Sequence, residues 1–462
     1  MKIAICASEV VPFAKTGGLA DVAGALPLAL EKEGESVIVI MPRYKAIQDS
    51  KFDIKRFSDD ISYSVIGKNI KVYFIESDNY FNRDQLYGDK NGDYKDNLDR
   101  FSYYCKRALD LLKEIEFKPD IIHVHDWQAC LVPVYLKNVF RKDAFYKNIK
   151  TVLTIHNIGY QGLFAKDEYS RLGLDWSLFN IEGLEFYDKI NILKGGLIFS
   201  DIINTVSPTY SKEIQTKEFG FGLEGVLNKK KASVFGILNG LDYSIWNPVT
   251  DKFIAKNFSV NSIGGKAKNK EDLQAICKLP KKKDIPLLGI VSRLAEQKGF
   301  DILAEAIDNI CRLDLQLVIL GTGDLKYHAI MEAMVKKYPK VISLHLKFDD
   351  TLAHKIYAGS DIFLMPSKYE PCGLGQLISL KYGTIPLVFK TGGLADTVNK
   401  NNGFVFDKYS REELLITVEK SITTFQDKKK WNALVTKAMK CDFSWEESAK
   451  EYLKLYAKAK TK

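Results

Sequence analysis

Short apolar runs alternate with longer amphipathic stretches along the first half of this chain. Apolar positions with helical spacing mark residues 19–32, 101–113 and 129–136. Strand-like runs fall around these stretches, at residues 3–7, 36–41, 72–75, 121–124, 151–154 and 202–206. Strands that alternate with helices in this order are typical of a parallel sheet with helices on both faces.

The pattern breaks in a polar, Pro-containing stretch at residues 236–248, and a Lys-rich, weakly apolar segment continues to about residue 284. We place the passage between two domains there. A second series of strand-like runs follows at residues 286–291, 315–320, 341–346, 362–365 and 385–389. The last segment, residues 444–456, is amphipathic and contains Trp445. Because no strand follows it, we expect a helix that packs back across the domain junction.

These patterns predict an α/β protein with two Rossmann-like domains that face each other across a deep cleft. A chain of 462 residues is longer than one hydrophobic core usually supports. We expect an N-terminal domain over residues 1–242, a C-terminal domain over residues 243–440, and a helix within residues 441–462 that packs on the N-terminal domain. Ligands of such sheets bind at the carboxyl ends of the strands, and clefts are common sites.

One seven-residue string, Lys-Thr-Gly-Gly-Leu-Ala-Asp, occurs twice, at residues 15–21 and 390–396. Each copy follows a strand-like run and precedes a helix-like one. A Gly pair at such a turn lets backbone N–H groups approach an anion, and a helix N-terminus favours negative charge. The repeat predicts two α/β halves of one closing cleft rather than two separate phosphate sites.

Composition narrows the function classes. The net charge of +9, from 67 basic and 58 acidic residues, is mild for this length, and no nucleic-acid motif accompanies the lysine clusters. Seven scattered cysteines without a CxxC pair favour buried thiols in a reducing compartment over disulfides or zinc. No apolar run reaches membrane-spanning length. We expect a cytoplasmic protein without nucleic-acid or membrane partners; the sequence leaves its oligomeric state open.

Two strand ends of the second series carry candidate chemistry. Arg293 and Lys298 follow one strand and suit a diphosphate, since Arg offers a planar fork and Lys a compact charge. The alternative is a salt-bridged surface loop. Glu370 follows another strand, before a Pro and two Gly, where a carboxylate can bind sugar hydroxyls or stabilise positive charge at an anomeric carbon. The alternative is a carboxylate that serves the dipole of the following helix.

Histidines mark two strand ends of the first series. His156 directly follows a strand and lines a cleft in one interpretation, or is a structural histidine bonded to the backbone in the other. His123 and His125 flank Val124, so both point to one face of a strand. A metal there needs further ligands, and we favour Asp126 as a cleft-lining residue instead.

Other enzyme classes are disfavoured by what the motifs lack. No G-x-G-x-x-G follows the first strand, which argues against a nicotinamide dehydrogenase, and no G-x-x-x-x-G-K-[ST] occurs, which argues against a P-loop NTPase. Cys372 has no His nearby in the sequence, so it is a close-packed wall rather than a nucleophile.

As a set, the motifs closely resemble those of bacterial and plant glycogen and starch synthases, the retaining GT-B enzymes of glycosyltransferase family 5. The motifs occur in family order, at residues 15–22, 123–127, 154–162, 204–210, 220–223, 236–242, 293–299, 370–376 and 390–396. The resemblance runs nearly end to end. It implies transfer of glucose from ADP-glucose, a nucleotide-sugar donor, to the non-reducing end of an α-1,4-glucan acceptor, without a metal or other cofactor.

The resemblance also implies residue roles. Arg293 and Lys298 hold the diphosphate and stabilise the leaving group, Glu370 bonds glucose hydroxyls, and His156 positions glucose near its C6 hydroxyl. The implied donor-binding residues are Lys15, Gly17, Gly18, Asn239, Arg293, Lys298, Cys372, Gly373, Leu374 and Gly375, and the implied acceptor or sugar subsite contains Asp126 and Asp21.

Two positions depart from the family pattern. Gly375 stands where Thr is usual, which loosens one phosphate contact, and Phe348 stands where many relatives have Tyr, which affects a contact to the nucleobase. Three alternatives remain open: use of UDP-glucose, short oligosaccharide primers, and a catalytically silent glucan-binding paralogue. Retention of the charged residues and His156 weighs against silence.

Overall fold

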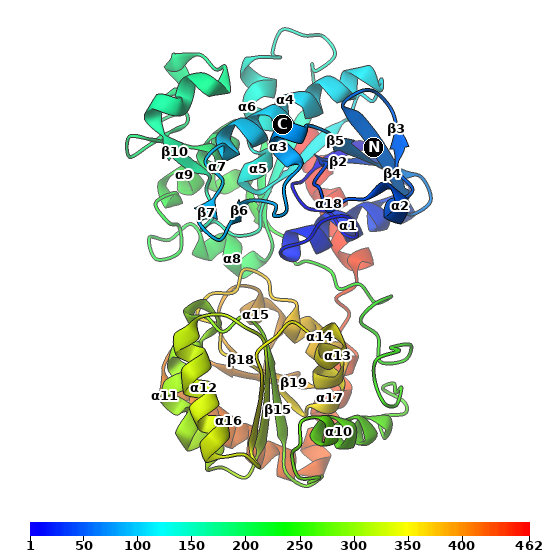
Figure 1. Cartoon of the computed structure of the whole chain (residues 1–462), viewed down its shortest axis with the longest axis vertical. Coiled ribbons are helices and arrows are strands. Elements are labelled where there is room, and N and C mark those ends of the chain that lie inside the picture. Colours follow the sequence, from blue (N-terminus) through cyan, green and yellow to red (C-terminus); the bar gives the residue numbers. More distant parts are fainter. The chain divides into compact units, whose positions relative to one another are not determined.

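The computed structural model describes residues 1–462, which divide into two compact α/β units (Figure 1). The N-terminal unit comprises Met1–Gly240 with Trp445–Lys462, and the C-terminal unit comprises Leu241–Ser444. The chain therefore leaves the N-terminal unit after Gly240, where we expected residue 242, and returns to it at Trp445, where we expected residue 441.

The N-terminal unit is built on a nine-stranded sheet with the order β14-β13-β9-β8-β1-β2-β5-β4-β3. Neighbours from β14 to β5 are parallel, and β4 and β3 form an antiparallel edge. The strands are β1 (Lys2–Cys6), β2 (Ser36–Pro42), β3 (Lys55–Arg56), β4 (Ile61–Ile66), β5 (Ile70–Ile75), β8 (Ile121–His125), β9 (Lys150–Ile155), β13 (Ile202–Thr205) and β14 (Val234–Gly236). The six parallel strands expected in this half are all present, whereas β3, β4 and β14 were not foreseen.

Helices and two small sheets complete this unit. The helices are α1 (Gly18–Lys32), α2 (Asp49–Phe52), α3 (Asp78–Phe81), α4 (Asn97–Glu114), α5 (Asp126–Ala129), α6 (Leu131–Asn138), α7 (Ile192–Phe199), α8 (Pro208–Glu213), α9 (Glu224–Lys229) and α18 (Trp445–Lys460). The small sheets are β6 (Gly88–Asp89) with β7 (Gly92–Asp93), and β10 (Leu163–Ala165), β11 (Glu185–Phe186) and β12 (Lys189–Asn191).

The last helix of the chain, α18, belongs to the N-terminal unit. It packs against α1, β8 and β9, and is drawn in red in Figure 1. Its Tyr452 and Tyr456 side chains are fully buried. The Ser448 hydroxyl donates a hydrogen bond to the Leu238 carbonyl oxygen at 2.8 Å. The end of the chain thus completes the core of the unit in which the chain begins.

The C-terminal unit has a six-stranded, fully parallel sheet with the order β17-β16-β15-β18-β19-β20. This is the strand order of a Rossmann fold. The strands are β15 (Leu287–Val291), β16 (Gln316–Leu320), β17 (Ile342–His345), β18 (Ile362–Met365), β19 (Ile385–Phe389) and β20 (Phe404–Phe406). The helices are α10 (Gly265–Ile276), α11 (Phe300–Cys311), α12 (Leu325–Lys337), α13 (Asp350–Gly359), α14 (Gly375–Lys381), α15 (Gly392–Thr397), α16 (Arg411–Gln426) and α17 (Lys428–Met439).

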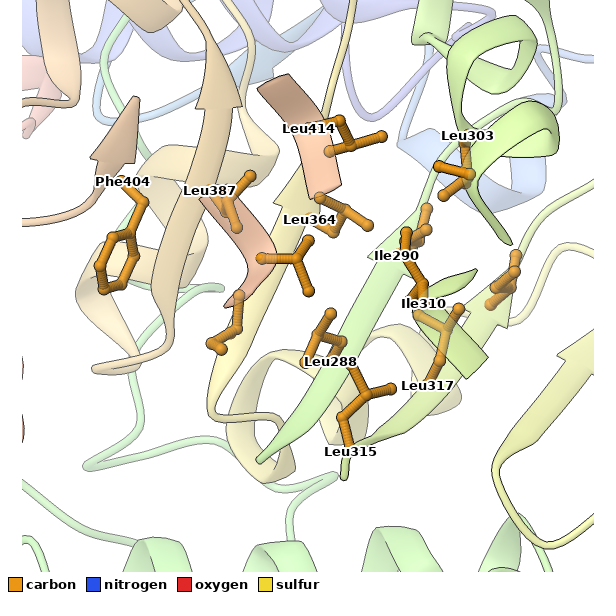
Figure 2. Packing of buried hydrophobic residues seen from close by; sticks show 14 of the residues in the cluster. Leu288, Ile290, Leu303, Ile310, Leu315, Leu317, Leu364, Leu387, Phe404 and Leu414 are labelled. Atoms are coloured by element: carbon orange, nitrogen blue, oxygen red, sulfur yellow. The ribbon is translucent and has the colours of Figure 1, made fainter. Parts of the chain in front are cut away.

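Helices cover both faces of this sheet, with α11, α12 and α16 on one side and α10, α13 and α14 on the other (Figure 1). Leu288 and Ile290 of β15 pack toward Leu303, Ile310 and other helix residues (Figure 2). The alternate position Leu287 joins the core cluster on the opposite face. A strand buried on both faces needs apolar residues at nearly every position, which explains the continuous apolar runs of this half.

The Lys-rich segment before β15 is folded, contrary to its interpretation as an inter-domain passage. It forms α10, which packs against α13. The Lys266 ammonium donates to the Ala358 and Tyr382 carbonyl oxygens at 3.0 and 3.1 Å. Lys270 pairs with Asp361 at 2.6 Å, and both side chains are buried. Lysine content misled the prediction because these ammonium groups lie inside the unit.

No helix of either unit has the length and apolar character needed to cross a membrane. None of the seven cysteines takes part in a disulfide.

Candidate functional site

The C-terminal unit brings its three charged candidates to one place. β15 and β18 are neighbours at the centre of the sheet, where the strand order reverses. Arg293 and Lys298 follow β15, and Glu370 follows β18. Ligands of doubly wound sheets bind outside the carboxyl ends of the strands at this switch point.

Glu370 is held firmly in this position. Its carboxylate is buried, and Oε2 accepts hydrogen bonds from Lys298 Nζ at 2.6 Å and from Ser367 Oγ at 3.0 Å. A charge-assisted hydrogen bond of this kind is stronger than a neutral one. The sequence indicated both charged residues but neither their mutual pairing nor Ser367, because a pairing between residues on separate loops leaves no local pattern.

Arg293 differs from Lys298. Its side chain is exposed and has no ion-pair partner in the structure, so the alternative of a salt-bridged surface loop is wrong for Arg293. The turn after β16 packs against the loop that contains Arg293. Leu294 N donates to the Thr322 carbonyl oxygen at 3.0 Å, and a side chain on Gly321 would meet the Ser292 carbonyl oxygen at 1.8 Å. The guanidinium group is therefore available to an anion.

The second copy of the repeated string supports the Glu370 loop. A Cβ atom on Gly392 would lie 2.0 Å from the Glu370 carbonyl oxygen, and one on Gly393 would lie 2.1 Å from the Cys372 carbonyl oxygen. Gly393 N donates to the Glu370 carbonyl oxygen at 3.1 Å. Gly392 also has a φ of +42°, which favours glycine. The Gly pair is needed here for close backbone packing.

The loop is closed on its other side by Gln376, whose Nε2 donates to the Cys372 and Gly373 carbonyl oxygens at 2.9 and 3.0 Å. Cys372 is buried and Leu374 half-buried, so both line the loop as apolar walls. A Cβ atom on Gly375 would lie 2.8 Å from the Phe363 ring. Phe363 thus fills the space that a larger residue at position 375 would need, which accounts for the glycine there.

In the N-terminal unit, the corresponding switch point lies where β1 and β8 are neighbours. Glu9 follows β1, Asp126 follows β8, and His156 follows the next strand, β9. Asp126 Oδ1 accepts a hydrogen bond from the backbone N–H of His156 at 2.7 Å. Burial raises the pKa of Asp126 to about 7, while the N–H groups of His156 and Asn157 oppose the shift.

Asp126 also adopts a left-handed backbone conformation with a φ of +53°. Such a conformation is uncommon for a residue with a side chain and persists only where the surrounding structure enforces it. Held in this conformation, Asp126 accepts the hydrogen bond from His156 N and so fixes the backbone at the start of the His156 loop.

Three histidines stack beneath this loop. The ring centroids of His123 and His125 are 4.2 Å apart, which confirms that both point to one face of β8. His125 stacks on His156 at 5.2 Å. The His123 ring nitrogens lie 2.8 Å from Tyr456 Oη and 2.7 Å from Thr154 Oγ1. Both nitrogens are thus engaged by hydroxyl groups, and the chain contains no group of three or more His, Cys, Asp or Glu residues arranged to hold a metal.

Burial keeps all three imidazoles neutral. It lowers the pKa of His123 and His156 to about 3, and that of His125 well below its usual value. Neighbouring imidazoles add to the shift for His123 and His125. A neutral imidazole carries one N–H and one free lone pair, so each ring donates one hydrogen bond and accepts one.

The turn formed by the first copy of the repeated string, residues 15–21, binds a carboxylate of the chain itself. The Glu9 carboxylate is buried and accepts from Thr16 N, from Thr16 Oγ1 at 2.6 Å and from Gly17 N at 3.2 Å. Tyr87 Oη donates to the same carboxylate at 2.6 Å. The backbone N–H groups of Thr16 and Gly17 are therefore already hydrogen-bonded within the protein. Tyr87 was missed because it lies 78 positions from Glu9 in the sequence, and Glu9 was missed because its spacing to the turn matches no motif.

The remaining candidates of this unit are placed as follows. Gly17 and Gly18 have open space where a side chain would lie. Lys15 Nζ pairs with Asp21 Oδ1 at 2.7 Å, and both side chains are partly exposed. Asn239 is buried, and its Oδ1 has no hydrogen-bond partner in the protein. An unpaired buried acceptor of this kind is uncommon in folded proteins.

Comparison with known proteins agrees with this architecture. Residues 273–438 match the family model described as Glycosyl transferases group 1. Sucrose-phosphate synthase (tll1590) from Thermosynechococcus elongatus has the same fold, with a TM-score of 0.62 and 17% identity over 99% of this chain and 98% of that one. Fold and switch-point residues thus define the class of two-domain glycosyltransferases.

Closer relatives specify the family. Residues 2–229 match the model described as Starch synthase catalytic domain. The chain belongs to this family, that of the glycogen and starch synthases. It is 48% identical to a glycogen synthase of Geotalea uraniireducens (99% of this chain, 98% of that protein) and 45% identical to one of Thermotoga maritima (100% and 99%). The catalytic domain of Starch Synthase IV from Arabidopsis thaliana bound to ADP and acarbose matches with a TM-score of 0.89 and 34% identity over 100% of this chain and 99% of that one.

These matches confirm the resemblance inferred from the motifs, together with the GT-B fold and the enzyme class.

Proposed function

We propose that this protein elongates α-1,4-glucan chains by transferring glucose, with retention of configuration, from ADP-glucose to the non-reducing end. The observation that carries the proposal is the Lys298–Glu370 pair at the switch point of the C-terminal unit, with the unpaired Arg293 on the loop before it. The ADP present in the starch synthase IV structure supports the choice of nucleotide.

We assign the donor diphosphate to Arg293 and Lys298. Breaking the anomeric bond places negative charge on the diphosphate, and positioned cations stabilise that charge as it develops. Lys298 has three N–H donors, of which one binds Glu370 in the structure. Its other donors serve a phosphate oxygen without loss of the Glu370 contact, so the lysine links the sugar-binding carboxylate to the leaving group.

We assign the donor glucose to Glu370, His156 and Asn239. The Glu370 carboxylate accepts hydroxyl protons, and its negative charge faces the positive charge that develops on the sugar. The unpaired Oδ1 of Asn239 accepts a further hydroxyl. Asp126 acts mainly by holding the His156 loop. We also assign Lys15, Gly17 and Gly18 to the donor, Asp21 to a sugar subsite, and the backbone of residues 372–375 to contacts with the sugar and phosphate.

We further propose that no metal cofactor takes part, since Arg293 and Lys298 supply the positive charge that a diphosphate needs. Chelation tests this directly: preincubation with EDTA should leave the transfer rate unchanged, and a rate that falls with EDTA and recovers with a divalent cation would contradict it. The seven cysteines form no disulfides, which supports a reducing compartment, and we propose the cytoplasm.

The deciding experiment supplies labelled ADP-glucose or UDP-glucose with glycogen and measures label in polymer. We expect incorporation from ADP-glucose. Lys298→Met should lower kcat by about 100–1000-fold, the usual cost of removing a group that stabilises transition-state charge. Lys390→Met is the matched control, because Lys390 is an exposed lysine of the second string that pairs with Asp407. No incorporation from either donor would reject the function, and a preference for UDP-glucose would reject the donor assignment.

A further inference from the structure

His125 occupies the middle of the histidine stack and has no assigned role. Its Nδ1 lies 2.9 Å from Nε2 of His156, with the two rings stacked at an interplanar angle of 29°. Its other nitrogen, Nε2, is buried and has no hydrogen-bond partner. His156 is half-buried, and no hydrogen bond within the protein engages its Nδ1.

A single proton lies between His125 Nδ1 and His156 Nε2. Both imidazoles are neutral, because burial lowers the pKa of each. A hydrogen bond between two neutral rings needs one N–H donor and one bare acceptor. Two arrangements satisfy this: either His125 Nδ1–H donates to His156 Nε2, or His156 Nε2–H donates to His125 Nδ1.

The unpaired nitrogen of His125 distinguishes the arrangements. If His156 donates, the single proton of His125 lies on Nε2, where it is a buried N–H without an acceptor. If His125 donates, its Nε2 is bare and only an acceptor is left unused. Orphaned buried N–H groups are rarer in folded proteins than unused acceptors. The geometry therefore favours His125 as the donor.

We propose that His125 is a positioning residue that fixes His156 as its Nδ1–H tautomer, so that His156 offers an N–H donor to a hydroxyl oxygen of the sugar. Backbone and ring of His156 are then held separately: Asp126 accepts from its backbone N–H, and His125 donates to its Nε2. The sugar as ligand rests on the proposed function, whereas the tautomer is a property of the free protein.

The tautomer is measurable on the full chain by two-bond ¹H–¹⁵N correlation spectra of ¹⁵N-histidine-labelled protein at neutral pH. The chain has only six histidines, and the His156 signals are identified by their loss in His156→Gln. We expect a protonated Nδ1 and a bare Nε2 for His156. The opposite tautomer in an enzyme that transfers glucose would overturn this inference alone. The expected tautomer in a protein that transfers none would overturn the proposed function alone.

Two variants separate positioning from packing. His125→Asn places an amide N–H near the former Nδ1 and should keep the His156 tautomer, while His125→Leu removes the donor and should shift the proton to Nε2. His125→Leu should also lower kcat/KM by about 10–100-fold, the size of effect known for partners that orient metal-bound histidines, and His125→Asn should restore most of it. Equal loss in both variants with an unchanged tautomer would overturn the proposal.

His123→Asn is the matched control, since His123 is equally buried on the same strand and stacks on His125 but makes no hydrogen bond to His156. It should lower the melting temperature and leave the His156 tautomer unchanged; a changed tautomer would overturn the assignment to His125. Should His125→Leu fail to fold, the spectra of wild type and His125→Asn still decide the question.

Discussion

Three carboxylates at strand ends, Glu9, Asp126 and Glu370, show how much a single residue's role depends on its partners. Glu9 accepts from backbone amides of the first repeated string, and Asp126 accepts from the amide that begins the His156 loop. Glu370 alone is bound by a flexible cation, Lys298. Glu9 and Asp126 are therefore fixed parts of the scaffold. The ammonium group of Lys298, which binds Glu370, can also donate to a ligand.

Glu370→Gln tests the role of the charge itself. Gln keeps the shape of the side chain but removes the negative charge that faces the developing cation. We expect kcat to fall by about 100–1000-fold, with a melting curve close to that of wild type, both measured on purified protein. Glu296→Gln is the control, since Glu296 is exposed and pairs only loosely with Lys368 at 3.5 Å. Near-normal turnover of Glu370→Gln would refute the assignment.

Asp126→Asn tests the buried carboxyl through pH. Its folded pKa of about 7 exceeds its ordinary value of 3.8, so the folded state binds more protons in that range and this residue's contribution to stability falls as pH rises from about 4 to about 7. The slope amounts to at most about 1.4 kcal/mol per pH unit. Asn still accepts the His156 amide without titrating, so denaturant titrations should show a variant that gains stability over wild type with rising pH.

The buried histidines change the pH dependence of stability in the opposite direction to Asp126. Their folded pKa values are depressed, so their contribution is present above about pH 6.5 and is lost as pH falls toward about 3. Comparing wild type and Asp126→Asn at each pH cancels this term. A stability difference that does not change with pH would contradict the raised pKa of Asp126.

At the scale of elements, the turns formed by the two copies of the repeated string make different contacts. In the first copy the glycines leave open space, and Glu9 binds the turn through its carboxylate. In the second copy the glycines contact the backbone of the Glu370 loop. Identical sequence therefore predicted the strand–turn–helix position of both copies correctly, but not their contacts, because those depend on the segment that lies against each turn.

A pair of matched substitutions follows. Gly393→Ala must displace the Cys372 carbonyl, which its Cβ would approach to 2.1 Å, and we expect a loss of about 1–3 kcal/mol in unfolding free energy, as in other overpacked sites. The equivalent Gly18→Ala meets no atom within 4 Å at the start of a helix, where Ala is favoured over Gly, and should keep or raise stability. Denaturant melts of both variants give the comparison; equal losses would contradict it.

Gly393→Ala should also reduce glucosyl transfer, because the shift reaches Glu370 through the carbonyl that Gly393 N binds. Initial rates with labelled donor measure this. Full activity in a destabilised Gly393→Ala variant would show that the Glu370 loop does not depend on the second string.

The sequence predicted elements best where strands are buried on both faces. β15 and β18 were recognised because such strands are almost wholly apolar. The antiparallel strand β4 was missed because Ser62 and Ser64 interrupt its apolar pattern, although both are buried. Short strands such as β14 and β20 carry too few residues for a periodicity. The α10 segment was misjudged because its lysines are buried by hydrogen bonds to distant carbonyl oxygens.

At the scale of the whole molecule, each unit gathers its candidate residues at the switch point of its own sheet. Sequence reasoning found these positions because the order of strands and helices identifies the carboxyl ends of strands. It could not supply the partners. The His125–His156 bond joins the end of β8 to the loop after β9, and the Tyr456–His123 bond joins residues that are 333 positions apart. Such pairings arise from tertiary packing and leave no local signal.

Because α18 packs in the N-terminal unit, we predict that it opens together with the strands of that unit. Tyr456→Phe removes the hydroxyl that lies 2.8 Å from His123 Nδ1 and leaves a buried imidazole nitrogen unpaired, which we expect to cost about 1–3 kcal/mol. Because proteins open in contiguous cooperative units, hydrogen exchange should quicken at amides of β8, β9 and α18, while β15 and β18 of the C-terminal unit keep their protection.

Tyr338→Phe provides the converse, since the Tyr338 hydroxyl donates to Asp308 within the C-terminal unit at 3.0 Å. Faster exchange should be confined to that unit. The loss of stability should be smaller than in Tyr456→Phe, because the Tyr338 site is only half-buried and Asp308 keeps its ion pairs with Arg312 and Lys337. Uniform quickening of exchange across both units in either variant would mean that the chain opens as a single body, and the last helix would then not serve the N-terminal unit alone.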